Sequence, residues 1–452
     1  MRKRHIALTA VIALLVAIYV GLGSLGLSPT NLIANIEVGT GMGAKLACSG
    51  RYISGFEADR IKSDLISYTS AYQLLDIDLD DTARRASVSL LGSSASASFR
   101  PGIGCSLDIG DTTPLDTLDV SRPGTDAMAW PRGSLVTTLD DAVQAQLVDI
   151  VRRDNAQDLD TRALLVVRNG QIVAEAYAPG YSPQTPFLGW SMGKSLTAIM
   201  LGKLELDGQT HTDTANLFPQ WQSDDRAELT LAQLLQMSSG LEFSEVYAPG
   251  SDATHMLFNA FDASSVPLHK PLVHEPGAHF AYSSGTTNLL ARYYVKLVGG
   301  SQAAYDELTD GLLRPLGLAH TFVEPDPSGV FVGSSYVYAS GRDWARLGLL
   351  MVNGGTLNGH RLLSEDWVRR ATTPNTSSND PRYGYQFWLN AGTEQPRWKD
   401  LPDDAYAMQG NRSQVVMMIP SANTVIARLG WSATAYPTND NFAEILSALA
   451  TH

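Results

Sequence analysis

Hydrophobic and polar residues follow two different periods along the chain, and each period predicts one type of secondary structure. Apolar side chains recur at spacings of three and four between 191 and 206, which predicts a helix. Strand-like runs at 163–168 and 171–177 flank Asn169-Gly170, a dipeptide typical of a tight β-hairpin turn. We therefore expect two antiparallel strands that lead toward the helix beginning near Ser191.

The other periodic segments predict one sheet with helices packed on it. Strands are expected over 86–91 and 95–100, and again near the C-terminus over 405–408, 415–419 and 424–429. Helices are expected over 57–75, 139–153, 229–237, 287–298, 301–313, 342–351, 364–371 and 442–450. Because strands occur at both ends of the large region and helices lie between them, distant segments must complete the same sheet. We interpret 207–280 as a helical insertion and the Asp-, Thr-, Pro- and Gly-rich stretch 110–133 as a linker.

The composition is that of a globular protein and argues against a nucleic-acid partner. Of the 452 residues, 44% are hydrophobic and 17% are charged, so the chain can bury a large core. The formal net charge is −13, and no basic stripe occurs beyond the first residues.

The N-terminus predicts export or anchoring in a membrane. Arg2, Lys3 and Arg4 precede an apolar run over Ile6–Leu27, which as a helix would be about 33 Å long and could span a bilayer. Because no small-residue cleavage site ends the run, we predict an uncleaved membrane anchor over 1–27. The protein would then be held in the inner membrane facing the periplasm. If the segment is cleaved, the protein would be secreted or periplasmic.

The two cysteines fit such a compartment. Cys48 and Cys105 lie 57 positions apart, and an oxidising exterior would join them in a disulfide. The alternative is a pair of buried free thiols, and two cysteines alone predict no metal site. The predicted organisation is therefore an anchor or signal segment, a small α+β region over 28–135 with this disulfide, and a large domain over 136–452.

Ser191 and Lys194 are the strongest local candidates for chemistry. On a helix, residues three apart share a face, so the serine hydroxyl and the lysine amine would lie side by side. A lysine whose pKa is lowered by burial can take the proton of a serine and make it a nucleophile. No other lysine of the chain has a serine three positions earlier. The alternative is an ordinary helix start, with Ser191 as N-cap and Lys194 in solvent.

Four stretches in order identify a resemblance to a family. They are Gly189-Trp-Ser-Met-Gly-Lys-Ser-Leu, Leu234-Leu-Gln-Met-Ser-Ser-Gly, Pro276-Gly-Ala-His-Phe-Ala-Tyr-Ser-Ser-Gly and Arg314-Pro-Leu-Gly-Leu. From about Leu139 to the C-terminus, the chain resembles the class C β-lactamase-like serine hydrolases. These include class C β-lactamases, D-Ala-D-Ala carboxypeptidases, related esterases and 6-aminohexanoate-dimer hydrolases. The resemblance implies an α/β (α+β) fold of the β-lactamase/transpeptidase type, with an antiparallel sheet flanked by helices and a helical subdomain.

The same resemblance implies roles for three residues. Ser191 matches the nucleophile, Lys194 the residue that activates it, and Tyr282 the tyrosine that passes a proton to the leaving group. We expect the lysine ammonium to lower the pKa of this tyrosine. The Tyr-x-Ser pattern is weak alone, because it also occurs at Tyr68 and Tyr338, and the alternative is a core tyrosine.

The third motif of the family departs from its usual pattern. The corresponding stretch is 408–414, Met-Gln-Gly-Asn-Arg-Ser-Gln, which has neither the lysine nor the histidine of the β-lactamases and carboxypeptidases. Gly410 would let a substrate backbone approach closely, and N–H groups there could form an oxyanion hole with that of Ser191. Asn411 is a candidate substrate contact, and whether Gln409, Asn411 or Arg412 takes over the charge role stays open.

These features favour an exported serine hydrolase that cleaves a small amide or ester through an acyl-enzyme on Ser191. No metal or cofactor is expected, and the sequence does not indicate an oligomeric state. One alternative is a cell-wall D-Ala-D-Ala carboxypeptidase or weak β-lactamase, which the missing cation of the third motif disfavours. The other is a non-catalytic binding protein on a hydrolase fold, which the intact Ser, Lys and Tyr set disfavours.

Overall fold

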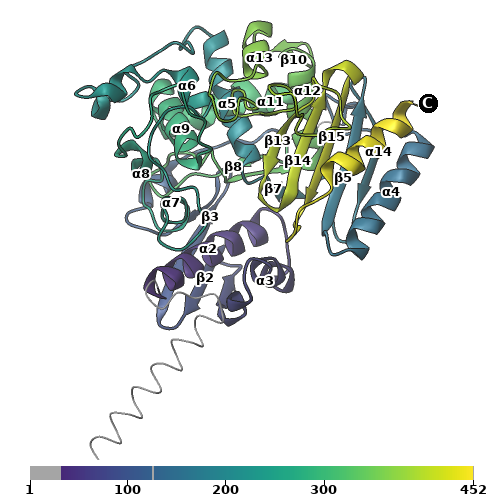
Figure 1. Ribbon diagram of the computed structural model, residues 1–452. Helices are drawn as coiled ribbons and strands as arrows, with labels where there is room; N and C mark the ends of the chain where they lie inside the picture. Colours follow the sequence, from purple (N-terminus) through teal and green to yellow (C-terminus); the bar gives the residue numbers. More distant parts are fainter. Residues whose placement is uncertain (1–31, 125–126, 451–452) are drawn as a thin grey trace, which may run out of the picture.

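The main sheet of the computed structural model joins segments from both ends of the large region (Figure 1). The structure describes residues 32–124 and 127–450, and the predicted anchor over 1–27 lies outside them. The sheet has the order β12-β13-β14-β15-β5-β6, and all its pairs are antiparallel. Its strands are β5 (Thr161–Arg168), β6 (Gln171–Tyr177), β12 (Trp388–Leu389), β13 (Tyr406–Gly410), β14 (Gln414–Ile419) and β15 (Thr424–Gly430). The prediction of one sheet completed by distant segments is confirmed.

Strand β5 lies between β15 and the edge strand β6, and it is buried on both faces. Leu164 and Val166 pack with α4 (Asp141–Ala156) and α14 (Thr438–Ala450) on one face. The alternate residues Ala163, Leu165 and Val167 face the opposite core, which contains α5 (Met192–Leu206) and α12 (Gly341–Val352). The predicted hairpin is confirmed, since both Asn169 and Gly170 have the positive φ of a primed turn.

The helical part lies at one end of the main sheet (Figure 1). It is built from α6 (Leu231–Leu235), α7 (Asp252–Phe258), α8 (Ser265–Leu268), α9 (Ser284–Val298), α10 (Ser301–Leu308), α11 (Arg314–Leu316) and α13 (Glu365–Ala371). A small sheet of order β7-β9-β8 joins β7 (Pro186–Leu188), β9 (Val337–Ser340) and β8 (Phe322–Val323), and β10 (Thr356–Leu357) pairs with β11 (His360–Arg361). The predicted helical insertion over 207–280 contains α6, α7 and α8.

The N-terminal region packs a helix layer on a second antiparallel sheet. The sheet has the order β1-β2-β3-β4, with β1 (Asp76–Asp80), β2 (Arg85–Leu90), β3 (Ser93–Arg100) and β4 (Gly104–Leu107). Its helices are α2 (Leu32–Tyr52) and α3 (Ala58–Ile66). The helix predicted over 57–75 is shorter than expected, because Thr69 is extended and its side chain caps a separate 3-10 turn over Ser70–Leu74.

Helix α2 was not predicted, and its glycines explain why. Each glycine inside a helix costs about 1 kcal/mol relative to alanine, so the glycines at 39, 41, 43 and 50 argue against a helix in this stretch. The helix forms because these positions pack closely against their neighbours. A Cβ at Gly41 would lie 2.3 Å from the carbonyl oxygen of Phe258, so only glycine lets α2 approach α7 this closely. Tertiary packing therefore overrides the local preference.

Covalent and ionic links hold α2 in place. Cys48 on α2 and Cys105 on β4 form the predicted disulfide, with Cα atoms 6.1 Å apart. One turn from Cys48, the buried Lys45 pairs with the buried Glu324 of the large region. The Glu324 carboxylate also accepts a hydrogen bond of 2.6 Å from the backbone N–H of Cys105. The disulfide-bearing elements are thus bound directly to the rest of the protein.

The stretch over 110–133 was predicted to be a loose linker, and that prediction is wrong for its described residues. Leu115 and Trp130 are buried in the same core as the main sheet. The guanidinium of Arg122 donates to the carbonyl oxygens of Ala319 and Thr321 at 2.8 and 2.9 Å. The stretch contains little regular structure, yet it is a strap fixed to the large region. Within the described part of the chain, no helix has both the length and the apolar character needed to cross a membrane.

Candidate active site

A sharp turn between β7 and α5 presents Ser191. Trp190 adopts a left-handed conformation with φ of 48°, which is rare for a bulky residue and persists only where packing enforces it. Its ring is buried and lies 6.4 Å from the rings of both Tyr336 and Trp431, centroid to centroid. Ser191 occupies the N-cap position of α5 but its side chain makes no capping hydrogen bond. In an ordinary helix start the Ser191 hydroxyl would cap the helix. Here it makes no capping bond and remains available for chemistry.

Lys194 lies beneath this hydroxyl and is buried. Its Nζ is 3.0 Å from Ser191 Oγ, 2.8 Å from Ser284 Oγ and 3.1 Å from the carbonyl oxygen of Ser334. Burial lowers the pKa of Lys194 to about 8, and the negative charge of Glu245 opposes this effect. A solvated lysine is thus excluded by the structure. The amine can lose its proton near neutral pH, as a general base must.

Tyr282 reaches the same place from the start of α9. Its ring stacks on Trp388 at a centroid distance of 5.0 Å, and Lys194 Nζ lies 4.9 Å from its centroid. A hydrogen bond with the Ser191 hydroxyl lowers the pKa of Tyr282, but desolvation by burial is larger and raises it. The expectation that the lysine ammonium would lower this pKa is therefore wrong. Tyr282 is a neutral phenol at neutral pH.

Glu245 and Tyr247 complete the network, and sequence reasoning missed both. Glu245 accepts hydrogen bonds of 2.6 Å from both the hydroxyl and the backbone N–H of Ser284. The Tyr247 hydroxyl lies 3.1 Å from Glu245 Oε1 and 3.4 Å from Ser284 Oγ. Both residues belong to an irregular loop after Gly240, where a single acid or aromatic residue carries no spacing signal. Only the folded chain brings this loop to Lys194.

The end of β13 forms the other side of the site. A Cβ at Gly410 would lie 2.0 Å from the carbonyl oxygen of Gly189, so the strand touches the serine turn and only glycine fits there. The backbone N–H of Ser191 has no hydrogen-bond partner among the residues that the structure describes. It is therefore free to stabilise an oxyanion close to Gly410. Asn411 is exposed, and its side chain accepts a hydrogen bond from the backbone N–H of Arg412.

Arg412 follows this strand end in the chain, and its side chain is held by aromatic residues. Its guanidinium carbon lies 3.6 Å from the ring centroid of Tyr68 and 5.9 Å from that of Trp431. The side chain is buried and its backbone φ is 63°, a left-handed conformation that directs the chain away from the regular strand. Arg412 thus links β13 to the N-terminal region.

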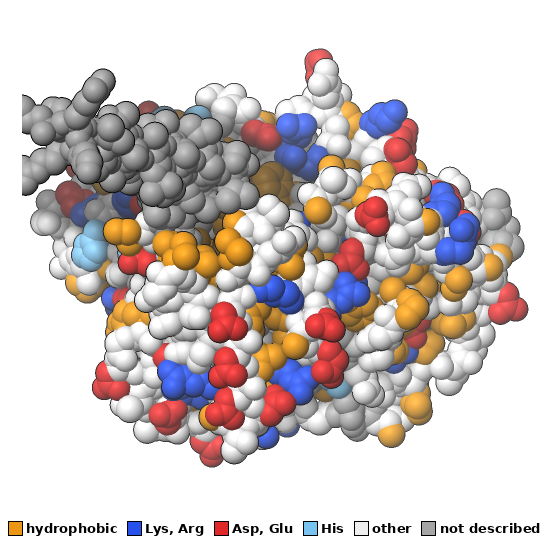
Figure 2. Space-filling model, turned by 90° about the horizontal axis from the view of Figure 1, so that it is seen from below, with side chains coloured by type: hydrophobic (Ala, Val, Ile, Leu, Met, Phe, Trp, Pro, Cys, Tyr) orange, Lys and Arg blue, Asp and Glu red, His pale blue; other side chains and the backbone are white. Residues whose placement is uncertain are grey.

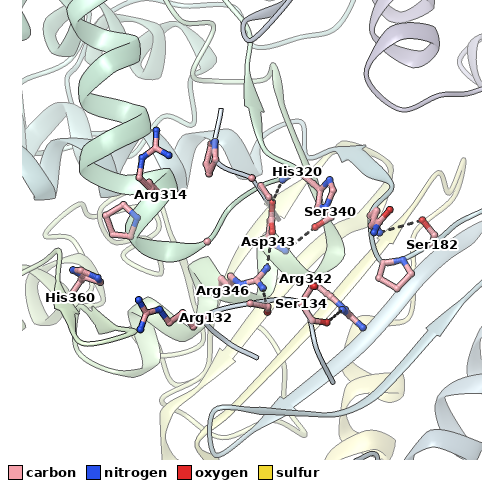
Figure 3. A pocket seen from close by; sticks show the side chains of 18 of the residues that line it. Arg132, Ser134, Ser182, Arg314, His320, Ser340, Arg342, Asp343, Arg346 and His360 are labelled. Carbon is pink, nitrogen blue, oxygen red and sulfur yellow. Dashed lines mark hydrogen bonds and ion pairs between the residues drawn. The ribbon is translucent and has the colours of Figure 1, made fainter. Parts of the chain in front are cut away.

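A wide cavity elsewhere on the large region does not contain this constellation (Figure 3). It measures about 800 Å³, and none of Ser191, Lys194 and Tyr282 lines it. Its basic side chains are Arg132, Arg314, His320, Arg342, Arg346 and His360. Arg342 pairs with Glu175 and Arg346 with Asp343, so much of this charge is neutralised within the protein. Across residues 32–124 and 127–450, no group of three or more His, Cys, Asp or Glu side chains is arranged to hold a metal ion.

Known proteins share both the fold and parts of the sequence. Residues 145–449 match the family model described as Beta-lactamase. A 6-aminohexanoate-dimer hydrolase of Paenarthrobacter ureafaciens is 24% identical over 304 residues, which cover 64% of this chain and 76% of that protein.

Two solved structures illustrate the shared fold. A Bacillus anthracis protein provisionally assigned as a 6-aminohexanoate-dimer hydrolase has a TM-score of 0.59 at 20% identity, covering 75% of this chain and 92% of its own. A novel penicillin-binding protein homologue from Caulobacter crescentus has a TM-score of 0.54 at 16% identity, covering 70% of this chain and 100% of its own. The expected β-lactamase/transpeptidase-like fold is confirmed.

Proposed function

The chain belongs to the beta-lactamase family, and from that premise we propose that it is an exported serine hydrolase that cleaves a small amide or ester through an acyl-enzyme on Ser191. One observation carries the proposal. The Ser191 hydroxyl lies 3.0 Å from a buried lysine amine whose pKa is about 8, so a nucleophile and its base are already in contact.

Acylation begins when the neutral amine of Lys194 takes the proton of Ser191. The serine Oγ then attacks the substrate carbonyl carbon, and the carbonyl oxygen becomes an oxyanion that the N–H of Ser191 and the end of β13 stabilise. The lysine ammonium that results is held by Ser284 Oγ and the carbonyl of Ser334. Glu245 lies behind Ser284 and stabilises this positive charge.

Tyr282 supplies the proton that the leaving group needs. Because burial raises its pKa, the phenol remains protonated at neutral pH and can donate to a leaving amine or alkoxide. The Lys194 ammonium, 4.9 Å from the phenol ring centroid, can return the proton. Water then attacks the acyl-enzyme with the same groups in reverse order, which frees Ser191 and releases the acid.

Two observations support an amide or ester rather than a penicillin or cell-wall peptide. The stretch over 408–414 contains no lysine or histidine, and its one cation, Arg412, is engaged by Tyr68. A cation that recognises a substrate carboxylate is therefore absent from this stretch. In addition, the named function of the Paenarthrobacter relative is hydrolysis of a small amide, the 6-aminohexanoate dimer.

Export is supported by the disulfide between Cys48 and Cys105, since such bonds persist in oxidising compartments. The apolar run over Ile6–Leu27 supports attachment to the inner membrane with the enzyme outside. Protease treatment of spheroplasts tests this orientation, because an external enzyme is degraded while the membrane stays intact. Protection of the whole chain would contradict the proposal.

Labelling with a fluorophosphonate followed by peptide mapping tests the mechanism, and Ser191 should be the modified residue. Ser191→Ala should abolish labelling and hydrolysis of chromogenic esters, whereas Ser195→Ala, one turn further along α5, should retain Ser191 labelling. Tyr282→Phe should lower kcat by at least about a hundredfold with little change in melting temperature. Stable acylation by a labelled penicillin would instead support the cell-wall alternative, and normal turnover by Ser191→Ala would refute the proposed nucleophile.

A further inference from the structure

A second cavity lies between the N-terminal region and the serine turn. It measures about 270 Å³, and we call it the α2 cavity because Ile36, Val38 and Met42 of helix α2 form one wall. Leu74 and Leu90 of the N-terminal region extend this wall. The region over 32–124 lies before the segment that matches the family model, so this wall is an addition to the family fold.

The opposite end of the α2 cavity is lined by neighbours of the proposed catalytic groups, although none of Ser191, Lys194 and Tyr282 lines it. Trp190, which immediately precedes Ser191, lines it, and so does Asn411, which follows Gly410. Tyr247 also lines it while its hydroxyl lies 3.1 Å from Glu245. Each of these three residues is therefore one peptide bond or one hydrogen bond away from the catalytic network.

The cavity wall is chemically suited to an apolar group. None of the described residues that line it is an acid, a lysine, an arginine or a histidine. Its volume is close to the lower end of the range for small-molecule sites, and it could hold roughly nine methylene-sized groups at about 30 Å³ each. The face shown in Figure 2 carries a band of hydrophobic side chains. Over residues 33–124, the large apolar side chains exposed to solvent are Ile33, Leu74 and Leu91.

We propose that the α2 cavity binds a medium-length alkyl or aromatic portion of the substrate while the substrate carbonyl lies at Ser191. This inference rests on the proposed function, and it makes the N-terminal region a specificity element of the hydrolase. The substrate class becomes an ester or amide with an uncharged apolar arm. Because the lining includes Trp190 and Tyr247, an arm in the cavity also shields the nearby lysine network from water.

Two ester series measure this preference with the full-length chain. In one series the acyl group grows from acetate to dodecanoate with a p-nitrophenol leaving group, and in the other an alkyl alcohol grows on a fixed acetyl group. Each methylene that leaves water should raise kcat/KM about fourfold at most. We expect an increase of at least about tenfold along one series, levelling off at the chain length that fills the cavity.

Ile36→Trp should fill the α2 cavity. It should lower the ratio of kcat/KM for octanoate to that for acetate at least about fivefold, or the corresponding ratio of the alcohol series. Ile33→Trp is the matched control on the same helix, because Ile33 is exposed and does not line the cavity, and it should keep the wild-type ratio. Leu74→Glu is the second variant. Leu74 is 62% exposed, so the fold should tolerate the change, and a charge at the cavity wall should lower the same ratio.

The possible results separate the two proposals. If wild type hydrolyses acetate esters but shows no preference in either series, or if Ile36→Trp and Leu74→Glu both keep the wild-type ratios, the α2 cavity is not a substrate site and the hydrolase mechanism stands. If the folded wild type hydrolyses no ester of either series and a fluorophosphonate leaves Ser191 unmodified, the proposed function is overturned and this inference with it.

Discussion

Replacing Glu245 by Gln should move the pH dependence of catalysis toward acid. Glu245 Oε1 lies 2.6 Å from Ser284 Oγ, which lies 2.8 Å from Lys194 Nζ, so one hydroxyl separates the carboxylate from the amine. The negative charge raises the pKa of Lys194 against the lowering effect of burial. Removing the charge must therefore lower this pKa further below about 8.

Coulomb's law sets the size of the effect. For charges roughly 5 Å apart, the interaction is worth about 3 kcal/mol at an effective dielectric constant near 20 and about 1 kcal/mol in water. The site is partly open, so we take about 1.4 kcal/mol, which corresponds to about one pKa unit. In the proposed mechanism the neutral amine is the active form, so kcat/KM should rise with pH. Its midpoint should move from about 8 in wild type to about 7 in the variant.

The assay is kcat/KM for a short chromogenic ester from about pH 6 to about pH 10. The midpoint is the quantity to compare, because Gln also alters the hydrogen bond to Ser284 and can change the height of the curve. Glu242→Gln is the matched control, since Glu242 is an exposed acid of the same loop. A midpoint that stays near 8 or moves upward in Glu245→Gln would refute the coupling between Glu245 and Lys194.

Three further predictions concern the strand end and the N-terminal region. Gly410→Ala should lower kcat/KM at least about tenfold, because the added Cβ would lie 2.0 Å from the carbonyl oxygen of Gly189 in the serine turn. A lower melting temperature with unchanged activity would contradict this reason. Replacing Cys48 and Cys105 by Ser should lower the free energy of unfolding by about 4 kcal/mol in urea titrations, and a reductant should destabilise wild type but not the variant. Lys45→Met should lower the free energy of unfolding by about 3 to 5 kcal/mol, because it leaves the Glu324 carboxyl buried without its partner. Adding Glu324→Gln should recover most of this loss. An unchanged urea midpoint for Lys45→Met would exclude a role for the pair in stability.

Local patterns were sufficient to predict the elements that present the proposed nucleophile. The hairpin over 163–177 follows from Asn169-Gly170 between two strand-like runs, and the helix after Ser191 follows from its apolar spacing. Both signals depend on neighbours in the sequence, so a single chain contains them. The contact between Ser191 and Lys194 is also local, because the two residues are three positions apart at the start of one helix.

Features that depend on distant contacts could not be predicted from such patterns. Helix α2 exists because Gly41 allows close packing against Phe258, a residue more than two hundred positions away. Glu245 acts through Ser284, and nothing in the spacing of the two residues indicates their contact. The pKa of Tyr282 was expected to fall because of a nearby ammonium, whereas it rises because desolvation depends on the whole surrounding fold.

The loop that follows Gly240 connects the proposed chemistry with the proposed specificity. Glu245 adjusts the pKa of Lys194, while Tyr247, two residues later, both contacts Glu245 and lines the α2 cavity. An apolar arm in the cavity would lie against Tyr247 and remove water from beside the carboxylate. Since charges interact more strongly as water is excluded, the arm would strengthen the coupling between Glu245 and Lys194. Binding of the substrate and activation of the serine would then depend on the same segment, which faces helix α2 across the cavity.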